Sequence, residues 1–193
     1  MKNQITRILP RSEWEKVVIH ETTQPLVEVG TTNRLKIALV EKRYTPSFFL
    51  RKAVALKHHK VAERLPKGIN LVLIEGWRSM QAQQISWDNL FDKFKKENST
   101  WSDEKIEQQV RLVVAKPSPL ANHHCGGASD VTLAYDDGTL LDMGTPYPSE
   151  AMSADWHQKF KMFSEEITDE QKANRAILRD AMETEDFVWY PGE

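Results

Sequence analysis

The side chains best suited to chemistry lie in residues 121–130, where the sequence reads H-x-x-G-x-A-x-D from His123 to Asp130. An imidazole and a carboxylate stand seven residues apart with Gly126 and Gly127 between them, and a glycine pair lets the backbone turn sharply. Because the run from Asp130 reads as a strand, the two side chains can converge on one point. Imidazole and carboxylate are ordinary zinc ligands, and a catalytic zinc takes three protein ligands and a water molecule. The segment therefore predicts two of three zinc ligands.

Neighbouring residues leave alternatives open within this segment. His124 is a second imidazole and would be the ligand if the register of the motif were shifted by one residue. Counting back from Gly126 and Asp130 favours His123. Cys125 is the only cysteine of the chain, and we interpret it as a small packed side chain rather than a thiolate ligand. A polar turn that binds no metal is the simpler interpretation of the same spacing.

The elements before the motif are predicted from apolar periodicity and from helix-breaking residues. Residues 35–40 and 69–74 are short apolar runs that predict strands, the second of them buried. Ser47 predicts the N-cap of a helix whose apolar spacing starts at Leu50 and which ends near Pro66. An apolar stripe predicts a second helix, and we interpret its aromatic residues as core-facing rather than as a ligand site. The stripe consists of Met80, Trp87, Leu90, Phe91 and Phe94.

The elements after this helix are predicted from capping and turn residues. Ser102 predicts the N-cap of a further helix with acidic residues in its first turn. The Asp-Gly pair at 137–138 predicts a hairpin turn whose return strand begins at Leu140. Residues 168–171 form a capping box that predicts another helix. The apolar run at 187–190 predicts a last strand.

These elements predict one α+β domain preceded by an arm. The chain has 193 residues, which suffices for a single sizeable hydrophobic core that needs no disulfide or structural metal to be stable. We predict residues 1–25 to be a loosely attached arm with a short strand at 17–19. Residues 26–193 are predicted to be a compact domain in which helices pack on a small antiparallel sheet that carries the zinc site.

Composition excludes several classes of partner. The net charge of −2 gives no basic excess, so we predict no nucleic-acid binding. No apolar run approaches the roughly 18 residues of a membrane span, and the charged N-terminus lacks the apolar region of a signal peptide. A single cysteine cannot form an internal disulfide, which fits a reducing compartment. We therefore predict a cytoplasmic protein, with its oligomeric state open.

The motif resembles the zinc signature S-x-H-x-x-G-x-A-x-D of the D-alanyl-D-alanine dipeptidases, zinc D,D-dipeptidases of the vancomycin-resistance type, with Ala121 in the place of the serine. Four further segments resemble the same family in the same order along the chain. They are residues 50–54, 71–79, 142–147 and 187–193. The resemblance covers about residues 26 to 193 and implies a zinc metallopeptidase with one zinc ion per chain.

The resemblance also implies a role for each matching residue. His123 and Asp130 would bind zinc, Glu193 would be the general base, and Arg78 would stabilise the oxyanion of the tetrahedral intermediate. In the family pattern this glutamate is followed by two further residues and then by a third zinc-binding histidine, so we expect the domain to be truncated at its C-terminus. His157 matches a family histidine outside the zinc site, and we do not expect it to replace the third ligand.

The implied substrate is the D-Ala-D-Ala dipeptide of cell-wall metabolism, hydrolysed to free D-alanine. The family places an acid near the ammonium group of the dipeptide; here Pro148 stands at that position, and Glu150 is the nearest acid that could bind substrate. Two alternatives stay open. An impaired or non-enzymatic relative that binds peptide is favoured because this sequence lacks the third zinc-binding histidine of the family pattern. A D,D-carboxypeptidase that acts on longer cell-wall peptides is favoured by the changes at Ala121 and Pro148.

Overall fold

The computed structural model describes residues 16, 18, 22–38, 44–111, 113–118, 121–145, 159 and 161–189. The predicted strand at 17–19 falls largely outside these residues. Helices and strands follow one another in a mixed order, which confirms the α+β class. The elements are β1 (Leu26–Glu28), β2 (Leu35–Ile37), β3 (Phe49–Arg51), α2 (Lys52–Arg64), β4 (Ile69–Glu75), α3 (Met80–Glu97), α4 (Asp103–Val110), β5 (Asp130–Tyr135) and α6 (Asp169–Glu183).

The main sheet has the strand order β2-β4-β5 and is mixed rather than antiparallel. β5 pairs antiparallel with β4, as expected, but β2 pairs parallel with β4. The connection from β2 to β4 contains β3 and α2, and a helical crossover of this kind returns the chain in the same direction. β3 belongs instead to a separate antiparallel pair with β1. The predicted all-antiparallel sheet is therefore wrong in the pairing of β2.

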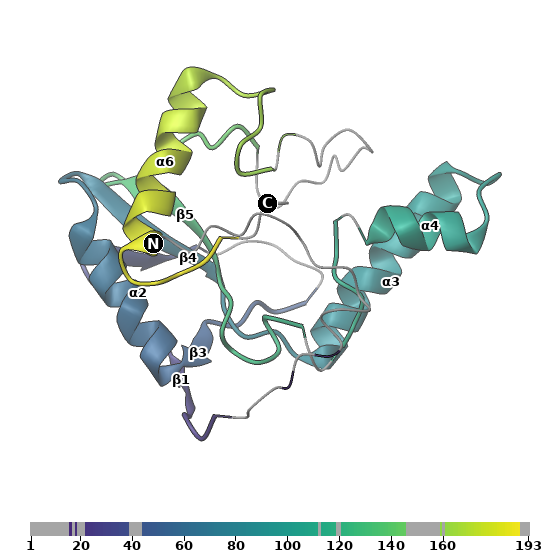
Figure 1. Cartoon of the computed structure of the whole chain (residues 1–193), viewed down its shortest axis with the longest axis horizontal. Helices are drawn as coiled ribbons and strands as arrows, with labels where there is room; N and C mark the ends of the chain where they lie inside the picture. Colours follow the sequence, from purple (N-terminus) through teal and green to yellow (C-terminus); the bar gives the residue numbers. More distant parts are fainter. Residues whose placement is uncertain are drawn as a thin grey trace.

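The main core lies between the sheet and the helices α2 and α6, which lie side by side in Figure 1. β4 is almost wholly buried, as its continuous apolar run predicts. Leu71 and Leu73 of β4 and Leu133 of β5 have no exposed surface and belong to one apolar core with the buried side chains of α2. Burying one such leucine contributes about 2 kcal/mol. This core fixes β4 and β5, the two strands that carry the predicted site residues.

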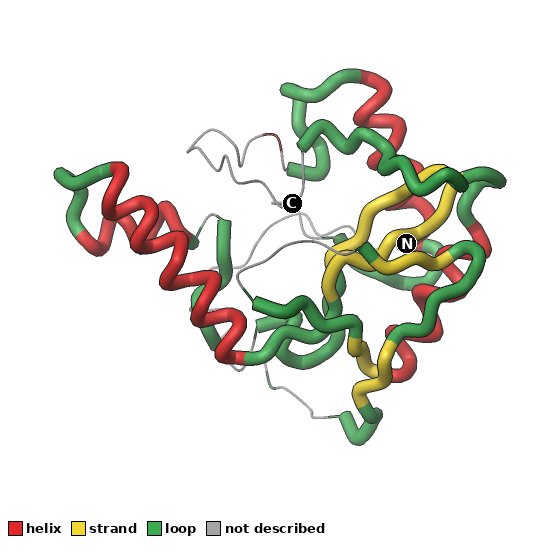
Figure 2. Tube along the Cα trace, turned by 180° about the vertical axis from the view of Figure 1, so that it is seen from behind, coloured by secondary structure: helices red, strands yellow, loops and turns green. Residues whose placement is uncertain are grey.

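Helices α3 and α4 form a hairpin with a second, smaller core, and both views show it extending away from the sheet (Figures 1 and 2). Trp87, Leu90 and Phe94 of α3 pack against Ile106 and Val110 of α4. The aromatic stripe is thus core-facing, which confirms its interpretation. Two predicted N-caps are also confirmed. Ser102 caps α4 by accepting the backbone N–H of Lys105, and the capping box of Thr168 begins α6.

Three local predictions are wrong. The helix expected from Ser47 begins at Lys52, because Leu50 and Arg51 pair with β1 as strand β3. The return strand at Leu140 is reduced to a single bridge with Ala134. The last strand predicted at 187–190 is absent over 187–189, the part of that run that the structure describes, because its aromatic rings pack on other side chains instead of on a strand.

Candidate metal and catalytic site

His123 and Asp130 meet at the edge of the main sheet. His123 Nε2 lies 3.3 Å from Asp130 Oδ1, and both side chains are about four-fifths buried. The other ring nitrogen, Nδ1, lies 2.7 Å from the backbone oxygen of Gly76. Because a carbonyl oxygen only accepts, Nδ1 carries the hydrogen and Nε2 keeps its lone pair on the side of Asp130. The predicted pair therefore meets in space with its tautomer fixed.

This arrangement of donors attracts a cation. Burial alone would lower the pKa of His123. The charge of Asp130, and the hydrogen bond that Nε2 donates to Asp130 once the ring is protonated, outweigh burial and raise that pKa. A histidine whose far nitrogen donates to a backbone carbonyl is the usual arrangement of a zinc-binding imidazole. One nitrogen and one carboxylate oxygen fit the donor preferences of zinc. Among the described residues no third His, Cys, Asp or Glu joins them, so the described part of the chain could offer a metal ion at most this pair of ligands here.

Arg78 stands beside this pair and is held by a buried carboxylate. Its Nε lies 3.1 Å from Glu75 Oε1, and its Nη2 donates to Glu75 Oε2. Nη1 donates to Gln83 Oε1 at 2.9 Å, and Nη2 lies 3.4 Å from Asp130 Oδ2. Burial opposes the charge of Arg78, but Glu75 more than compensates and raises its pKa. The guanidinium is therefore a fixed positive charge next to the His123–Asp130 pair.

Glu75 is itself fully buried at the end of β4. Besides Arg78, it accepts a hydrogen bond of 3.0 Å from the hydroxyl of Tyr44. The Tyr44 ring also lies 5.8 Å from the Arg78 guanidinium carbon. Burial is the main cause that raises the pKa of Tyr44, so its hydroxyl stays protonated and keeps donating. Tyr44 and Glu75 together orient Arg78, whose Nη2 contacts both Glu75 and Asp130.

Backbone hydrogen bonds join the Arg78 turn to the motif. The N–H of Arg78 donates to the oxygen of His123 at 3.2 Å, and the N–H of Arg51 donates to the oxygen of Gly126 at 2.9 Å. The Arg51 side chain adds a bond of 2.9 Å to the oxygen of Cys125. On the other side of β3, the N–H of Trp77 donates to the oxygen of Phe49. β3 thus holds both site segments at once, although the sequence predicted a helix there.

His58 holds the motif from the opposite side, on helix α2. It is fully buried, and its Nε2 lies 2.7 Å from the hydroxyl oxygen of Ser129, the residue before Asp130. Its Nδ1 lies 2.8 Å from the backbone oxygen of Val54. The His58 ring also meets Phe187 edge-on, with ring centroids 4.8 Å apart. His58 therefore contacts both the motif and the segment after α6.

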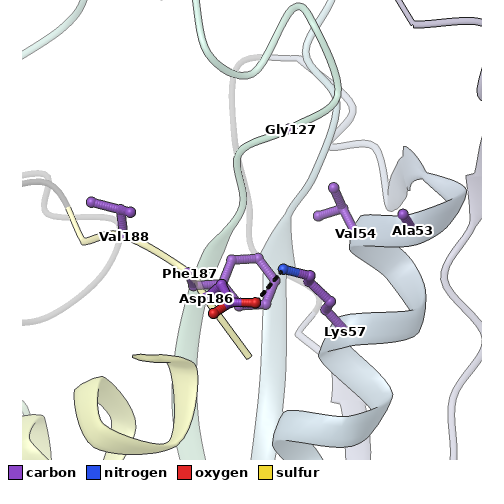
Figure 3. A pocket seen from close by; sticks show the side chains of 7 residues that line it. All are labelled: Ala53, Val54, Lys57, Gly127, Asp186, Phe187 and Val188. Carbon is purple, nitrogen blue, oxygen red and sulfur yellow. Dashed lines mark hydrogen bonds and ion pairs between the residues drawn. The ribbon is translucent and has the colours of Figure 1, made fainter. Parts of the chain in front are cut away.

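Beside these contacts, α2, the motif and the segment after α6 line a pocket of about 320 Å³. Figure 3 shows the side chains that line it. Gly127 of the motif lines it together with Val54 of α2 and Phe187 and Val188 of the segment after α6. Lys57 and Asp186 form an ion pair of 3.4 Å across it. Phe187 and Val188 thus lie beside the motif.

The remaining predicted residues are placed as follows. His124 Nδ1 lies 3.3 Å from the oxygen of Arg78, and its ring stacks on Trp77 rather than meeting Asp130. Cys125 is exposed, and its thiol donates to a backbone oxygen. Glu193 and Glu150 lie outside the described residues, as does His157.

Sequence reasoning missed the supporting residues around the site. The signal for Glu75 was a carboxylate at the end of an otherwise apolar run. A buried acid needs a partner of opposite charge, and Arg78 follows it by three residues. A histidine on the apolar face of a helix gave a weaker signal for His58. Nothing local pointed to Tyr44, which reaches Glu75 from 31 residues away.

Comparison with known proteins gives one family. The model of peptidase family M15, described as D-ala-D-ala dipeptidase, matches residues 41–193, well over half of the chain. The match includes Arg78, His123, Asp130 and Glu193. A search of curated proteins returned no match. No helix in the described part of the chain combines the length and the apolar character that a bilayer span requires.

Proposed function

We propose that this chain, which belongs to the D-ala-D-ala dipeptidase family, hydrolyses D-Ala-D-Ala to two molecules of D-alanine at a zinc site that includes His123 and Asp130. The family is one of zinc-dependent metallopeptidases that act on dipeptides. The observation that carries the proposal is the contact of 3.3 Å between His123 Nε2 and Asp130 Oδ1, with the Arg78 charge beside it.

His123 and Asp130 would hold the zinc ion, which when bound polarises the scissile carbonyl and lowers the pKa of water. The chain prepares this binding in two ways. Gly76 fixes the hydrogen of His123 on Nδ1, so that Nε2 can donate its lone pair. Arg78 Nη2 lies 3.4 Å from Asp130 Oδ2, which leaves Oδ1 on the side of His123.

Arg78 would stabilise the oxygen of the scissile carbonyl as it gains negative charge. A guanidinium is always charged and offers several donors in a rigid plane. Glu75 and Gln83 already hold Arg78 in place, so little reorganisation is needed when the charge develops. Removing a fixed donor of this kind from an oxyanion site typically costs about 10²–10³ in kcat.

Glu193 would take a proton from the attacking water and return it to the nitrogen of the leaving amino acid as the C–N bond breaks. Glu150 would meet the ammonium group of the dipeptide. Support for the first role is the course of the chain: Phe187 contacts His58 and lines the same pocket as Gly127 of the motif. The assignment of Glu193 rests on the family pattern, and that of Glu150 rests on its being the acid nearest to the family position, which Pro148 occupies here.

The test is zinc binding and hydrolysis by the purified protein and by three variants. His123→Ala and Asp130→Ala should each lose zinc binding and release of D-alanine. His124→Ala is the matched control because it removes an adjacent imidazole that does not contact Asp130, and it should retain zinc. Hydrolysis that survives His123→Ala would overturn the proposed site.

A second substrate separates the dipeptidase from the carboxypeptidase. The protein should release D-alanine from the free dipeptide and not from a wall pentapeptide that ends in D-Ala-D-Ala. Cleavage of the pentapeptide alone would show a D,D-carboxypeptidase instead. Zinc binding without cleavage of either peptide would show a relative that binds metal but has no peptidase activity.

A further inference from the structure

We propose that His58 and Ser129 form a positioning pair that holds Asp130 in place for metal binding. The proposal rests on the proposed function, since it takes Asp130 as a zinc ligand. His58 is a buried residue of α2 with no atom in the site, and Ser129 is the residue next to the ligand. Neither belongs to the H-x-x-G-x-A-x-D pattern.

The direction of the hydrogen bond between the two residues follows from their partners. His58 Nδ1 lies 2.8 Å from the backbone oxygen of Val54, which only accepts, so Nδ1 carries the hydrogen. Nε2 is then an acceptor, and the Ser129 hydroxyl must donate to it across 2.7 Å. Both nitrogens of the ring are satisfied, and the bond can form in only one direction.

The sheet alone holds Asp130 loosely. β5 pairs regularly with β4 from Val131 onward, but the register shifts between Leu73 and Glu75, opposite the start of β5. An irregularity of this kind leaves the ladder locally disrupted. On its other side, hydrogen bonds from Arg51 hold the turn at Cys125 and Gly126, four residues before Asp130. The Ser129 hydroxyl is therefore a specific anchor between that turn and an irregular strand end.

The anchor acts from the side opposite the ligand contacts. In extended chain, successive side chains project to opposite faces. Ser129 meets His58 on α2, whereas the Asp130 carboxylate meets His123 and Arg78. The bond to His58 fixes Ser129 to helix α2. It therefore also fixes the direction in which the next residue, Asp130, presents its carboxylate.

Two further observations support this role. Burial lowers the pKa of His58 to about 4, so at neutral pH the ring is uncharged and Nε2 stays an acceptor. Phe187 covers the edge of the ring at 4.8 Å between centroids, which limits the access of water to the bond. A hydrogen bond shielded in this way is strong and costly to leave unmade.

The first test of the His58–Ser129 pair changes Ser129 and measures zinc affinity by competition with a chelating dye. Ser129→Ala removes the donor and should weaken zinc binding by about 10- to 100-fold, the usual effect of losing a residue that orients a ligand. Ser129→Thr keeps a hydroxyl at the same position, and its affinity should return close to that of the unaltered protein. This rescue distinguishes a specific bond from a loss of packing.

A matched pair of variants at His58 tests the same bond from the helix. Gln can place its carbonyl oxygen near the position of Nε2 and accept from Ser129, whereas Asn reaches only the position of Nδ1. His58→Gln should therefore retain zinc affinity, and His58→Asn should lose it to the same degree as Ser129→Ala. His59→Gln on the same helix is the control and should change nothing, since Ser129 bonds to the neighbouring ring.

The visible spectrum of the cobalt-loaded protein provides a readout that folding alone does not change. Ser129→Ala should shift the cobalt absorption bands while its thermal midpoint shows that it remains folded at the temperature of measurement. Unchanged zinc affinity and an unchanged cobalt spectrum in Ser129→Ala would overturn the positioning role. If the unaltered protein binds zinc and His123→Ala does not, that result leaves the proposed site standing; if neither binds zinc, both proposals fail.

Discussion

Glu75 and Arg78 form a two-point ion pair at the end of β4, and Glu75 has no exposed surface at all. A fully buried carboxylate is costly unless its charge is matched, and here the match is the guanidinium that also approaches Asp130 within 3.4 Å. The Arg78 guanidinium therefore neutralises a buried charge of the fold and is also part of the proposed site. Stability and chemistry are coupled at this point.

Glu75→Gln should destabilise the fold and impair catalysis together. The substitution keeps the shape of the side chain but leaves Arg78, whose side chain is only 14% exposed, without its main counter-charge. Breaking a buried pair in this way costs about 3–5 kcal/mol, which urea denaturation would measure. The kcat for D-Ala-D-Ala should fall because Arg78 is no longer oriented.

A second substitution separates the two effects. Arg78→Met in the Glu75→Gln background removes the uncompensated charge, so part of the lost stability should return, while kcat should fall further because the proposed oxyanion donor is gone. Lys95→Gln breaks an exposed pair with Asp103 and should cost less than about 1 kcal/mol. A Glu75→Gln variant as stable as Lys95→Gln would contradict the argument.

Gly126 and Gly127 should respond differently to alanine although they are neighbours in the motif. Gly126 has a φ of +73°, a conformation that costs other residues about 1–2 kcal/mol, and an added Cβ would collide with the side chain of Leu26. Gly127 has no such φ, and its Cβ would meet only the Cys125 sulfur at 3.3 Å. Gly126→Ala should therefore lower both the free energy of unfolding and zinc affinity, and Gly127→Ala neither.

Leu26→Ala offers a rescue that tests the cause. In the Gly126→Ala background it removes the colliding side chain but not the backbone strain, so stability should recover in part. Full recovery would show that φ is unimportant at this turn. If stability does not recover at all, the collision with Leu26 is not the cause of the loss in Gly126→Ala.

The sequence predicted best what neighbouring residues decide. Ser102, Thr168 and the Asp-Gly pair at 137–138 each act within four residues, and all three occur where expected. The meeting of His123 and Asp130 was predictable for the same reason, since a turn and a strand start bring them together over seven residues.

What the sequence could not predict depends on distant pairing. Leu50 continues a helical apolar spacing, but its pairing with Val27 makes it strand β3. The bond between Tyr44 and Glu75 joins residues 31 positions apart, and that between His58 and Ser129 joins residues 71 positions apart. Single-sequence periodicity carries no information about such partners, so the residues that orient the site were missed while those within the motif were found.

Acid should destabilise the protein through His58. Its pKa is about 4 in the folded protein and 6.5 in its ordinary state, so the unfolded chain takes up the proton first as the pH falls. The contribution of His58 to the free energy of unfolding is therefore fully present above pH 6.5. It declines as the pH drops below that value and stops declining below about pH 4. One pKa unit corresponds to about 1.4 kcal/mol, so the loss should approach about 3 kcal/mol.

Urea denaturation of the metal-free protein between pH 7 and pH 4, compared with His58→Gln, isolates this contribution. The variant has no imidazole at that position, so the stability difference between the two proteins should shift in favour of the variant as the pH falls. His123 has a raised pKa and contributes in the opposite direction, but equally in both proteins, so it cancels. A difference that stays constant from pH 7 to pH 4 would show that His58 does not enter the fold as the neutral acceptor that Ser129 requires.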